Sequence, residues 1–345
     1  AFPARLLALD GGGLRGFFSL QIAARMERLL REHTGNPDLV LSDWFHYIGG
    51  TSTGAIIATF LSWGLSVTEI ERLYVGNVAR IFRRAPLLDQ LTRHRFVATG
   101  LTRFLSEYFV EKDGSAATLG TERLRTALLV VTRNASTGSA WPVCNNPGAL
   151  YNSVDFPGCN LRIPLWKLVR ASTAAPTYFP PEIIATHGAD GNPLTFAFED
   201  GGVTPFNNPA IQLFLMATDP AYRLCWERGR EKLMLVSIGS GRVRRGRGSK
   251  WTAGYVAQAR DLPPALIDSF QQYQDLACRS LGECVHGEPV DGELGTMQGA
   301  RPDALFRYAR YDRCFTEAEL APIRRYSPRG FAMDRPEMIR FLQEA

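Results

Sequence analysis

The sequence predicts an α/β protein built on a largely parallel sheet. Short apolar runs that suit buried strands alternate along the chain with segments of helical periodicity. Glycine-rich turns follow some of these runs, at residues 10–16, 50–54 and 200–202. In open α/β sheets, ligands bind beyond the carboxyl ends of the strands. We therefore expect the three glycine turns to border a site.

The expected elements follow from apolar runs and helix-end signals. Gly35 stands where a helix would end, and Ser66 with Glu69 has the spacing of a capping box that begins a helix at Val67. Strands are predicted at residues 6–9, 45–49, 128–132, 196–198 and 233–238, and helices at 14–33, 55–61, 67–84 and 164–174.

After Gly241 the chain is more polar, and we expect it to be mostly helical. Capping-box spacing recurs there in two pairs, Thr316 with Glu319 and Asp334 with Glu337. The ten residues 241–250 include five basic side chains. Such a run can face anionic lipid headgroups or form a solvated loop, and the sequence leaves both open.

Composition excludes several classes of protein. With 45% hydrophobic residues and a net charge of +5, the chain is typical of a globular protein and too weakly basic to indicate nucleic-acid binding. The uncharged stretch 47–68 is long enough to cross a membrane, but its glycines favour a buried strand, turn and helix. The six cysteines are scattered, without metal-ligand spacing. We expect them to be reduced in a cytoplasmic protein; a secreted protein with a few disulfides also fits.

The first glycine turn, Asp10-Gly-Gly-Gly-Leu-Arg15-Gly16, lies between a predicted strand and a predicted helix. Glycines there leave backbone N–H groups uncovered for an anion. The spacing of Gly11, Gly13 and Gly16 also satisfies the dinucleotide-binding fingerprint. That alternative requires an acidic residue at the end of a second strand, and none stands there.

The second turn, Gly50-Thr-Ser52-Thr-Gly54, matches the G-x-S-x-G nucleophile elbow, in which a serine sits on a tight strand-to-helix turn. The pattern has only three fixed positions, so a glycine- and serine-rich helix cap is the alternative. Its place between a predicted strand and a predicted helix favours a nucleophile.

A nucleophilic serine needs a base. None of the five histidines stands in a glycine-bounded turn. Asp200, in the third turn with Gly201 and Gly202, follows an apolar strand and could take the serine proton directly if it were desolvated. An ordinary Asp-Gly turn is the alternative reading of Asp200. A Ser–His–Asp triad with His187 or His286 as the base also stays open.

The three turns together resemble the patatin-like phospholipases, whose pattern is D-G-G-G-x-R-G, then G-x-S-x-G, then D-G-G or D-G-A. Residues 171–181, 208–210 and 237–241, and the stretches 276–287 and 333–344, are similar to that family too. The resemblance covers nearly the whole chain. It implies a single catalytic domain over residues 1–345, with a motif core at about 5–241 and a helical part at about 242–345 packed on it.

The resemblance further implies a three-layer α/β/α fold and a serine lipid acyl hydrolase without metal or cofactor. Ser52 is then the nucleophile and Asp200 the general base, and Arg15 assists by charge or by holding the loop. The oxyanion hole is then formed by Gly11, Gly12 and Gly13. The other glycines of the motifs support the two later turns: Gly50, Gly54, Gly201 and Gly202. On this interpretation Asp10 is a structural anchor.

The implied substrate is a lipid, reached from a membrane surface that the protein touches peripherally. Some members of the family are effector lipases switched on by a small signal or a partner, and no residue here identifies such a site. The headgroup, the acyl position and the oligomeric state stay undetermined by the sequence.

Overall fold

The computed structural model describes residues 3–83, 85–86, 94–243, 255–316 and 318–319. Its centre is a sheet in the order β5-β6-β3-β2-β1-β7-β10-β9, with β4 paired to β3. The five pairings from β3 through β9 are parallel, and those of β4, β5 and β6 are antiparallel. The strands of the sheet are β1 (Ala4–Leu9), β2 (Tyr47–Thr51), β3 (Ala127–Asn134), β4 (Ser139–Cys144), β5 (Glu182–His187), β6 (Pro193–Asp200), β7 (Leu233–Ile238), β9 (Glu283–His286) and β10 (Arg307–Tyr311). The predicted, mostly parallel α/β sheet is confirmed.

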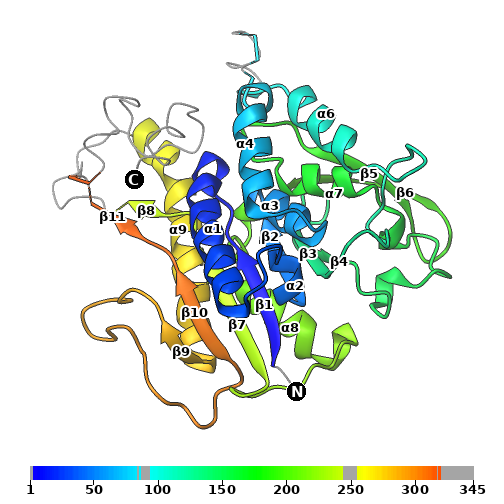
Figure 1. The fold of residues 1–345 in the computed structure, drawn as a ribbon. Helices are drawn as coiled ribbons and strands as arrows, with labels where there is room; N and C mark the ends of the chain where they lie inside the picture. The colour runs from blue at the N-terminus through cyan, green and yellow to red at the C-terminus, as the bar shows by residue number, and fades with distance from the viewer. Residues whose placement is uncertain (1–2, 84, 87–93, 244–254, 317, 320–345) are drawn as a thin grey trace.

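Helices cover both faces of this sheet (Figure 1). The α-helices are α1 (Gly16–Thr34), α2 (Leu41–Trp44), α3 (Thr53–Ser62), α4 (Val67–Ile81), α6 (Thr99–Tyr108), α7 (Leu165–Ser172), α8 (Ala210–Thr218) and α9 (Tyr255–Leu281). Short 3-10 helices lie at η1 (Gly13–Arg15), η2 (Leu150–Asn152), η3 (Asn160–Arg162), η4 (Gly201–Val203) and η5 (Pro220–Tyr222), and a separate pair of strands at β8 (Arg242–Val243) and β11 (Cys314–Phe315).

The side chains of β1 divide the core into two layers. Leu7 and Leu9 pack with α1, α3, α4, α6 and α7, whereas Leu6 and Ala8 pack with α8 and α9. Successive side chains of a strand point to opposite faces, so the uninterrupted apolar run of β1 marks a strand buried on both sides. This is the expected three-layer arrangement.

Local helix signals are also confirmed. Gly35 ends α1 in the left-handed conformation, and Ser66 and Glu69 form both bonds of a capping box before α4. The hydrogen bonds of the second such pair, Thr316 with Glu319, are present too. The pair Asp334 and Glu337 and the basic residues 244–250 lie outside the described residues. All six cysteines are described and free.

The prediction of a helical part after Gly241 is only partly correct. α9 is a long helix, but β9 and β10 join the main sheet, where β10 pairs with β7 in parallel. The sequence of β10, Arg-Tyr-Ala-Arg-Tyr, carries two charged residues and is not recognisable as a buried strand. Residues after Gly241 therefore complete the sheet rather than merely pack on it.

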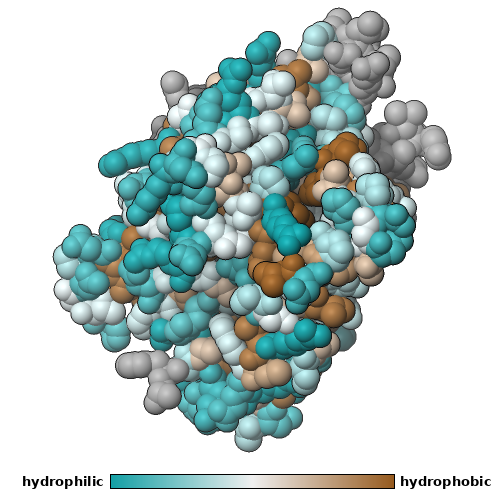
Figure 2. Space-filling model, turned by 90° about the vertical axis from the view of Figure 1, so that its right-hand side faces the viewer, coloured by the Kyte–Doolittle hydropathy of each residue, from teal (hydrophilic) through white to brown (hydrophobic). Residues whose placement is uncertain are grey.

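The antiparallel end of the sheet carries exposed apolar side chains. Figure 2 views this side of the molecule, and brown residues gather near its centre among teal ones. The exposed large apolar residues of this region are Leu150, Tyr151, Val154, Ile183 and Leu194. None of them lines the pocket that contains Ser52.

Candidate active site

Ser52 occupies the turn between β2 and α3 with φ 55° and ψ −125°, a conformation that non-glycine residues rarely adopt. A Cβ on Gly50 would lie 2.1 Å from the carbonyl oxygen of Gly54, and one on Gly54 would lie 2.3 Å from that of Leu9. The two glycines are therefore required by space. The turn is the strained strand-to-helix elbow that the sequence predicts.

Asp200, the last residue of β6, lies against this serine. Ser52 Oγ donates a hydrogen bond of 2.6 Å to Asp200 Oδ2, and the N–H of Gly202 donates one of 2.7 Å to Oδ1. A Cβ on Gly201 would lie 2.3 Å from the carbonyl oxygen of Val131. The second and third glycine turns thus meet at one hydrogen bond between a hydroxyl and a carboxylate.

Burial controls the basicity of this carboxylate. The side chain of Asp200 is almost entirely inaccessible, and desolvation raises its pKa from 3.8 to about 6. The hydrogen bonds from Ser52 and Gly202 and the charge of Arg170 oppose the rise in pKa. Asp200 is therefore mostly ionised at neutral pH, yet more basic than an exposed aspartate.

A serine that the sequence analysis did not single out holds the elbow. Ser172, the last residue of α7, accepts a 2.9 Å hydrogen bond from the N–H of Ser52 and donates one of 2.6 Å to the carbonyl of Val131. It lies within the stretch 171–181 that resembles the family. Nothing in the sequence distinguishes its hydroxyl from other serines, because its partners are distant along the chain.

The first glycine turn lies beside Ser52, and its three N–H groups differ. The N–H of Gly11 donates to the carbonyl of Asn207 at 3.1 Å. Among the residues described, no acceptor binds the N–H groups of Gly12 and Gly13, and both glycines line the pocket. The expectation that all three are oxyanion donors therefore needs a correction, since Gly11 is engaged within the protein.

The Gly11 carbonyl is the fixed point of this turn. It accepts hydrogen bonds from Asn207 Nδ2 at 3.3 Å, Ser240 Oγ at 3.1 Å and Gln271 Nε2 at 3.4 Å. The hydroxyl of Tyr74 donates to the carbonyl of Gly13 at 2.9 Å. None of these four side chains was named as a site residue from the sequence, although Ser240 lies in the family-like stretch 237–241, a glycine turn at the end of a predicted strand.

Arg15 and Asp10 flank the turn without facing the pocket. Arg15 is buried, and its Nη1 donates to the carbonyl of Gly241 at 3.0 Å. Of the two roles expected for Arg15, this geometry fits holding the loop. Asp10 is fully buried and forms a two-pronged ion pair with Arg310, as a structural anchor does.

The histidine and dinucleotide alternatives gain no support. His187 and His286 are exposed, and no histidine is among the described residues that line the pocket around Ser52. The strand β2 ends at Thr51 and is followed by Ser52, where a dinucleotide site requires an acidic residue. The carboxylate of Asp10 is committed to Arg310.

The pocket above Ser52 is mostly apolar. It is open to solvent and encloses about 800 Å³ of empty space when the open solvent at its mouth is included. Its apolar lining comes from Ile56, Tyr74, Ile81, Phe82, Leu101, Ala175, Tyr178, Phe179, Val203 and Ile267. Its polar lining comes from Ser52, Thr53, Thr173, Asp200 and Asn207, together with the glycine turn.

Comparison with known families agrees with this geometry. The family model described as patatin-like phospholipase matches residues 7–214, which include Ser52, Asp200 and the glycine turns. The chain belongs to the patatin-like phospholipase family. The match ends before β7, so β7, α9, β9 and β10 lie beyond it.

Similar curated proteins are plant patatins. Patatin-17 of Solanum cardiophyllum is 29% identical over 249 residues, which is 68% of this chain and 60% of that protein. Patatin-T5 of Solanum tuberosum is 26% identical over 245 residues, with the same two coverages. The chain thus spans about 60% of the length of these relatives.

Similar solved structures are distant. VipD from Legionella pneumophila has a TM-score of 0.35 at 12% identity, covering 100% of this chain and 67% of VipD. The type III effector protein ExoU has a TM-score of 0.25 at 15% identity, covering 50% of this chain and 40% of ExoU.

Replacing Ser172 tests whether its hydroxyl holds the elbow. Ser172→Ala leaves the N–H of Ser52 without its partner, and a buried donor left unpaired costs about 1–3 kcal/mol. We expect urea unfolding to show a loss of stability of that size, and turnover of an ester substrate to fall because Ser52 is no longer held. Ser106→Ala, at a half-buried serine of α6 whose hydroxyl donates to the carbonyl of Arg103 in the same helix, is the control. Unchanged turnover in Ser172→Ala would contradict the role.

Asp200→Asn is expected to stabilise the protein while removing its base. The raised pKa means that ionised Asp200 destabilises the native state above about pH 6, and that this cost disappears below the unfolded-state value of 3.8. At about 1.4 kcal/mol per pKa unit, the cost at pH 8 is ~3 kcal/mol. Urea unfolding at pH 8 should show Asp200→Asn to be the more stable protein, with the difference shrinking as the pH falls towards 4. A less stable variant at pH 8 would count against a desolvated carboxylate.

Proposed function

We propose that this protein is a serine hydrolase that cleaves fatty-acyl ester bonds of lipids, with Ser52 as nucleophile and Asp200 as general base. The observation that carries the proposal is the 2.6 Å hydrogen bond from Ser52 Oγ to Asp200 Oδ2 in the lining of a mostly apolar pocket. The family to which the chain belongs supports the same reaction class.

In the first half of the reaction, Ser52 Oγ attacks the ester carbonyl carbon and its proton passes to Asp200 Oδ2. The carbonyl oxygen becomes an oxyanion in a tetrahedral intermediate. When the intermediate collapses, the bond to the leaving oxygen breaks and Asp200 returns the proton to that oxygen. The products are the departing alcohol or lysolipid and an acyl ester on Ser52.

In the second half, water replaces the alcohol. Asp200 takes a proton from the water as its oxygen attacks the acyl ester, and returns it to Ser52 Oγ when the fatty acid leaves. One carboxylate can serve both halves because its pKa, about 6, lies near neutral pH.

The N–H groups of Gly12 and Gly13 are the proposed oxyanion donors. They border the pocket beside Ser52, and no other described group occupies them. Donors held in place before the charge develops lower the barrier without reorganisation, and loss of one such donor typically costs about 10²–10³ in kcat. Proline is the one residue that would remove a backbone N–H, and its fixed φ would also change the turn, where Gly13 has φ 57°. The positioning of the donors is therefore the testable quantity.

The proposed substrate class follows from the pocket walls. Side chains such as Ile56, Leu101 and Phe179 offer nothing to a charged headgroup but can bury an acyl chain. Transfer of each buried CH₂ from water contributes about 0.8 kcal/mol. We therefore place the acyl chain in the pocket and the headgroup at its mouth.

We further infer that the substrate enters from a lipid surface. Ile267 of α9 lines the pocket, and Leu262 and Leu266 of the same helix are 57% and 46% exposed. Arg83, also exposed, directly follows the pocket residue Phe82. Within the described part of the chain, no helix is long and apolar enough to cross a bilayer. A peripheral contact through α9 fits these observations.

Acyl-ester hydrolysis tests the dyad. We expect Ser52→Ala and Asp200→Asn each to lower kcat/KM by several orders of magnitude, because one removes the nucleophile and the other the base. In the wild type, kcat/KM should fall below about pH 6 as Asp200 takes up a proton.

The control is the double variant His187→Ala/His286→Ala. Both histidines are exposed and away from the pocket, so activity and the fall below about pH 6 should be retained. Loss of activity in this variant would favour a histidine base. Full activity in Ser52→Ala or Asp200→Asn would sink the dyad.

A second experiment tests the lipid surface. The double variant Leu262→Gln/Leu266→Gln should weaken binding to anionic phospholipid vesicles by about tenfold or more, because loss of apolar insertion worth 1.4 kcal/mol is already tenfold. Hydrolysis of a water-soluble short-chain ester should stay unchanged, since neither leucine lines the pocket. Leu294→Gln, at an exposed leucine between β9 and β10, is the control. Equal losses of vesicle binding and of short-chain ester hydrolysis would contradict a surface role.

A further inference from the structure

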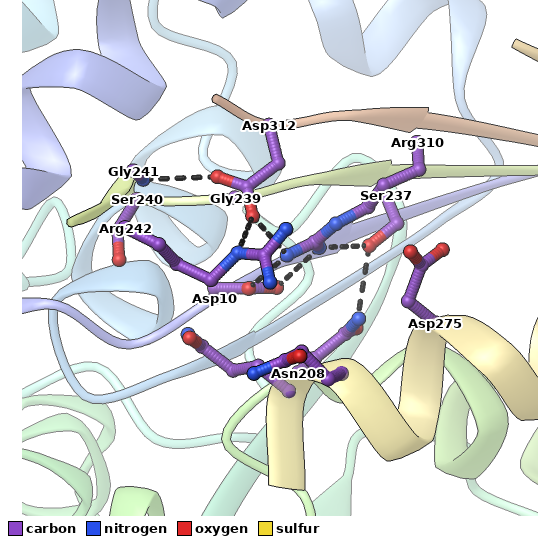
Figure 3. Close-up of polar contacts among 12 residues, drawn as sticks. Asp10, Asn208, Ser237, Gly239, Ser240, Gly241, Arg242, Asp275, Arg310 and Asp312 are labelled. Atoms are coloured by element: carbon purple, nitrogen blue, oxygen red, sulfur yellow. Dashed lines mark hydrogen bonds and ion pairs between the residues drawn. The ribbon is translucent and has the colours of Figure 1, made fainter. Parts of the chain in front are cut away.

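A buried ionic cluster lies at the carboxyl ends of β1, β7 and β10. Arg310 of β10 reaches past β7 to Asp10, with Nη1 2.9 Å from Oδ1 and Nη2 2.6 Å from Oδ2. Its Nη1 also donates to Ser237 Oγ at 2.6 Å. The side chains of Asp10 and Arg310 are 0% and 4% exposed. Figure 3 shows them pointing toward each other, with Asp312 and Arg242 nearby.

The contacts continue from Arg310 to the far end of the glycine turn. Arg310 Nη2 lies 3.1 Å from Asp312 Oδ2, and Asp312 Oδ1 accepts the N–H of Gly241 at 3.0 Å (Figure 3). The carbonyl of Gly241 in turn accepts Arg15 Nη1 at 3.0 Å. This series of contacts therefore connects the two ends of the glycine turn. It starts at Asp10, immediately before the glycines, and ends at Arg15, immediately after Leu14.

We propose that this path, Asp10–Arg310–Asp312–Gly241–Arg15, is a clamp that positions the N–H groups of Gly12 and Gly13 for the oxyanion. The inference rests on the proposed function, because it assigns the clamp to the same reaction. Its residues touch neither substrate nor Ser52, so they are positioning residues. Gly241, Arg310 and Asp312 lie beyond the residues that the family model matches.

The strands alone do not need the clamp. β1 pairs with β7 along its whole length, and β7 with β10 over Arg307–Tyr311. Asp10, Arg15, Gly241 and Asp312 all lie outside these strands, in the segments that leave them. The clamp therefore acts on the loops that follow the sheet.

The glycine turn has reason to need external support. Glycine loses more conformational freedom on ordering than any other residue, so three in a row make a soft loop. Oxyanion donors are effective only when they are already in place. A bidentate guanidinium–carboxylate pair has a defined geometry as well as strength, which an apolar contact would lack.

Replacing both members of the central ion pair tests the clamp. Removing one partner of a buried pair leaves an unpaired charge, whereas replacing both by uncharged residues is often tolerated. In Asp10→Asn/Arg310→Met we expect hydrogen–deuterium exchange at the hydrogen-bonded N–H groups of Gly11 and Arg15 to be faster by tenfold or more. With a water-soluble short-chain ester, kcat should fall at least tenfold while KM stays within twofold. Affinity for a trifluoromethyl ketone, which forms an oxyanion on serine, should fall in parallel with kcat/KM.

Two further variants complete the design. Asp312→Asn breaks the clamp at a second point and should show the same split between kcat and KM, so the test does not depend on the folding of the double variant. Arg230→Met/Glu283→Gln removes a different ion pair, bonded at 2.9 Å, between the segment before β7 and the strand β9. That control should keep wild-type exchange and kcat.

The exchange measurement separates this proposal from the proposed function. If the wild type hydrolyses no ester, the proposed function fails, and exchange at the N–H groups of Gly11 and Arg15 still decides the clamp. Wild-type exchange and wild-type kcat in folded Asp10→Asn/Arg310→Met or Asp312→Asn would overturn it. Equal changes in the Arg230 and Glu283 control would overturn it too, because the effect would then be one of general stability.

Discussion

The site depends on a close approach between the ends of two neighbouring strands, β1 and β2. A Cβ on Gly54 would lie 2.3 Å from the carbonyl oxygen of Leu9, and one on Gly16 would lie 2.3 Å from the Thr53 side chain. A Cβ on Gly11 would lie 3.1 Å from that of Ser52. Only glycine at these positions lets the ends of β1 and β2 lie so close together. This close approach brings the N–H groups that follow β1 next to the hydroxyl that follows β2, and the pocket is built over them.

The sequence predicts this part of the site because each motif is local. A glycine that must avoid a neighbouring backbone is recognisable at its own position in the sequence, and so is a serine in an elbow. The residues that hold the turn through hydrogen bonds form no such motif in the sequence. Ser172, Asn207 and Gln271 make hydrogen bonds to the elbow or the glycine turn from distant segments, and each resembles any other polar residue in the sequence.

The strand β10 shows the same limit at the level of the fold. Buried strands are recognised by apolar runs, and Arg310 interrupts the run in β10 with a charge. That charge is buried only because Asp10, 300 positions earlier, lies opposite it. A pattern read along the chain cannot contain this pairing. The family resemblance reaches the motifs, but the sheet is completed by residues whose burial only the three-dimensional structure explains.

Asp10 and Asp200 are both buried, and their hydrogen-bond partners distinguish the structural anchor from the proposed base. Both carboxyls are inaccessible, and desolvation raises the pKa of each to about 6. Asp10 has both oxygens taken up by the guanidinium of Arg310, so it can neither approach a hydroxyl nor accept its proton without breaking an ion pair. Asp200 meets a hydroxyl at one oxygen and a backbone N–H at the other. Of the two buried aspartates, only Asp200 has an oxygen whose hydrogen-bond partner carries a proton that the reaction must move.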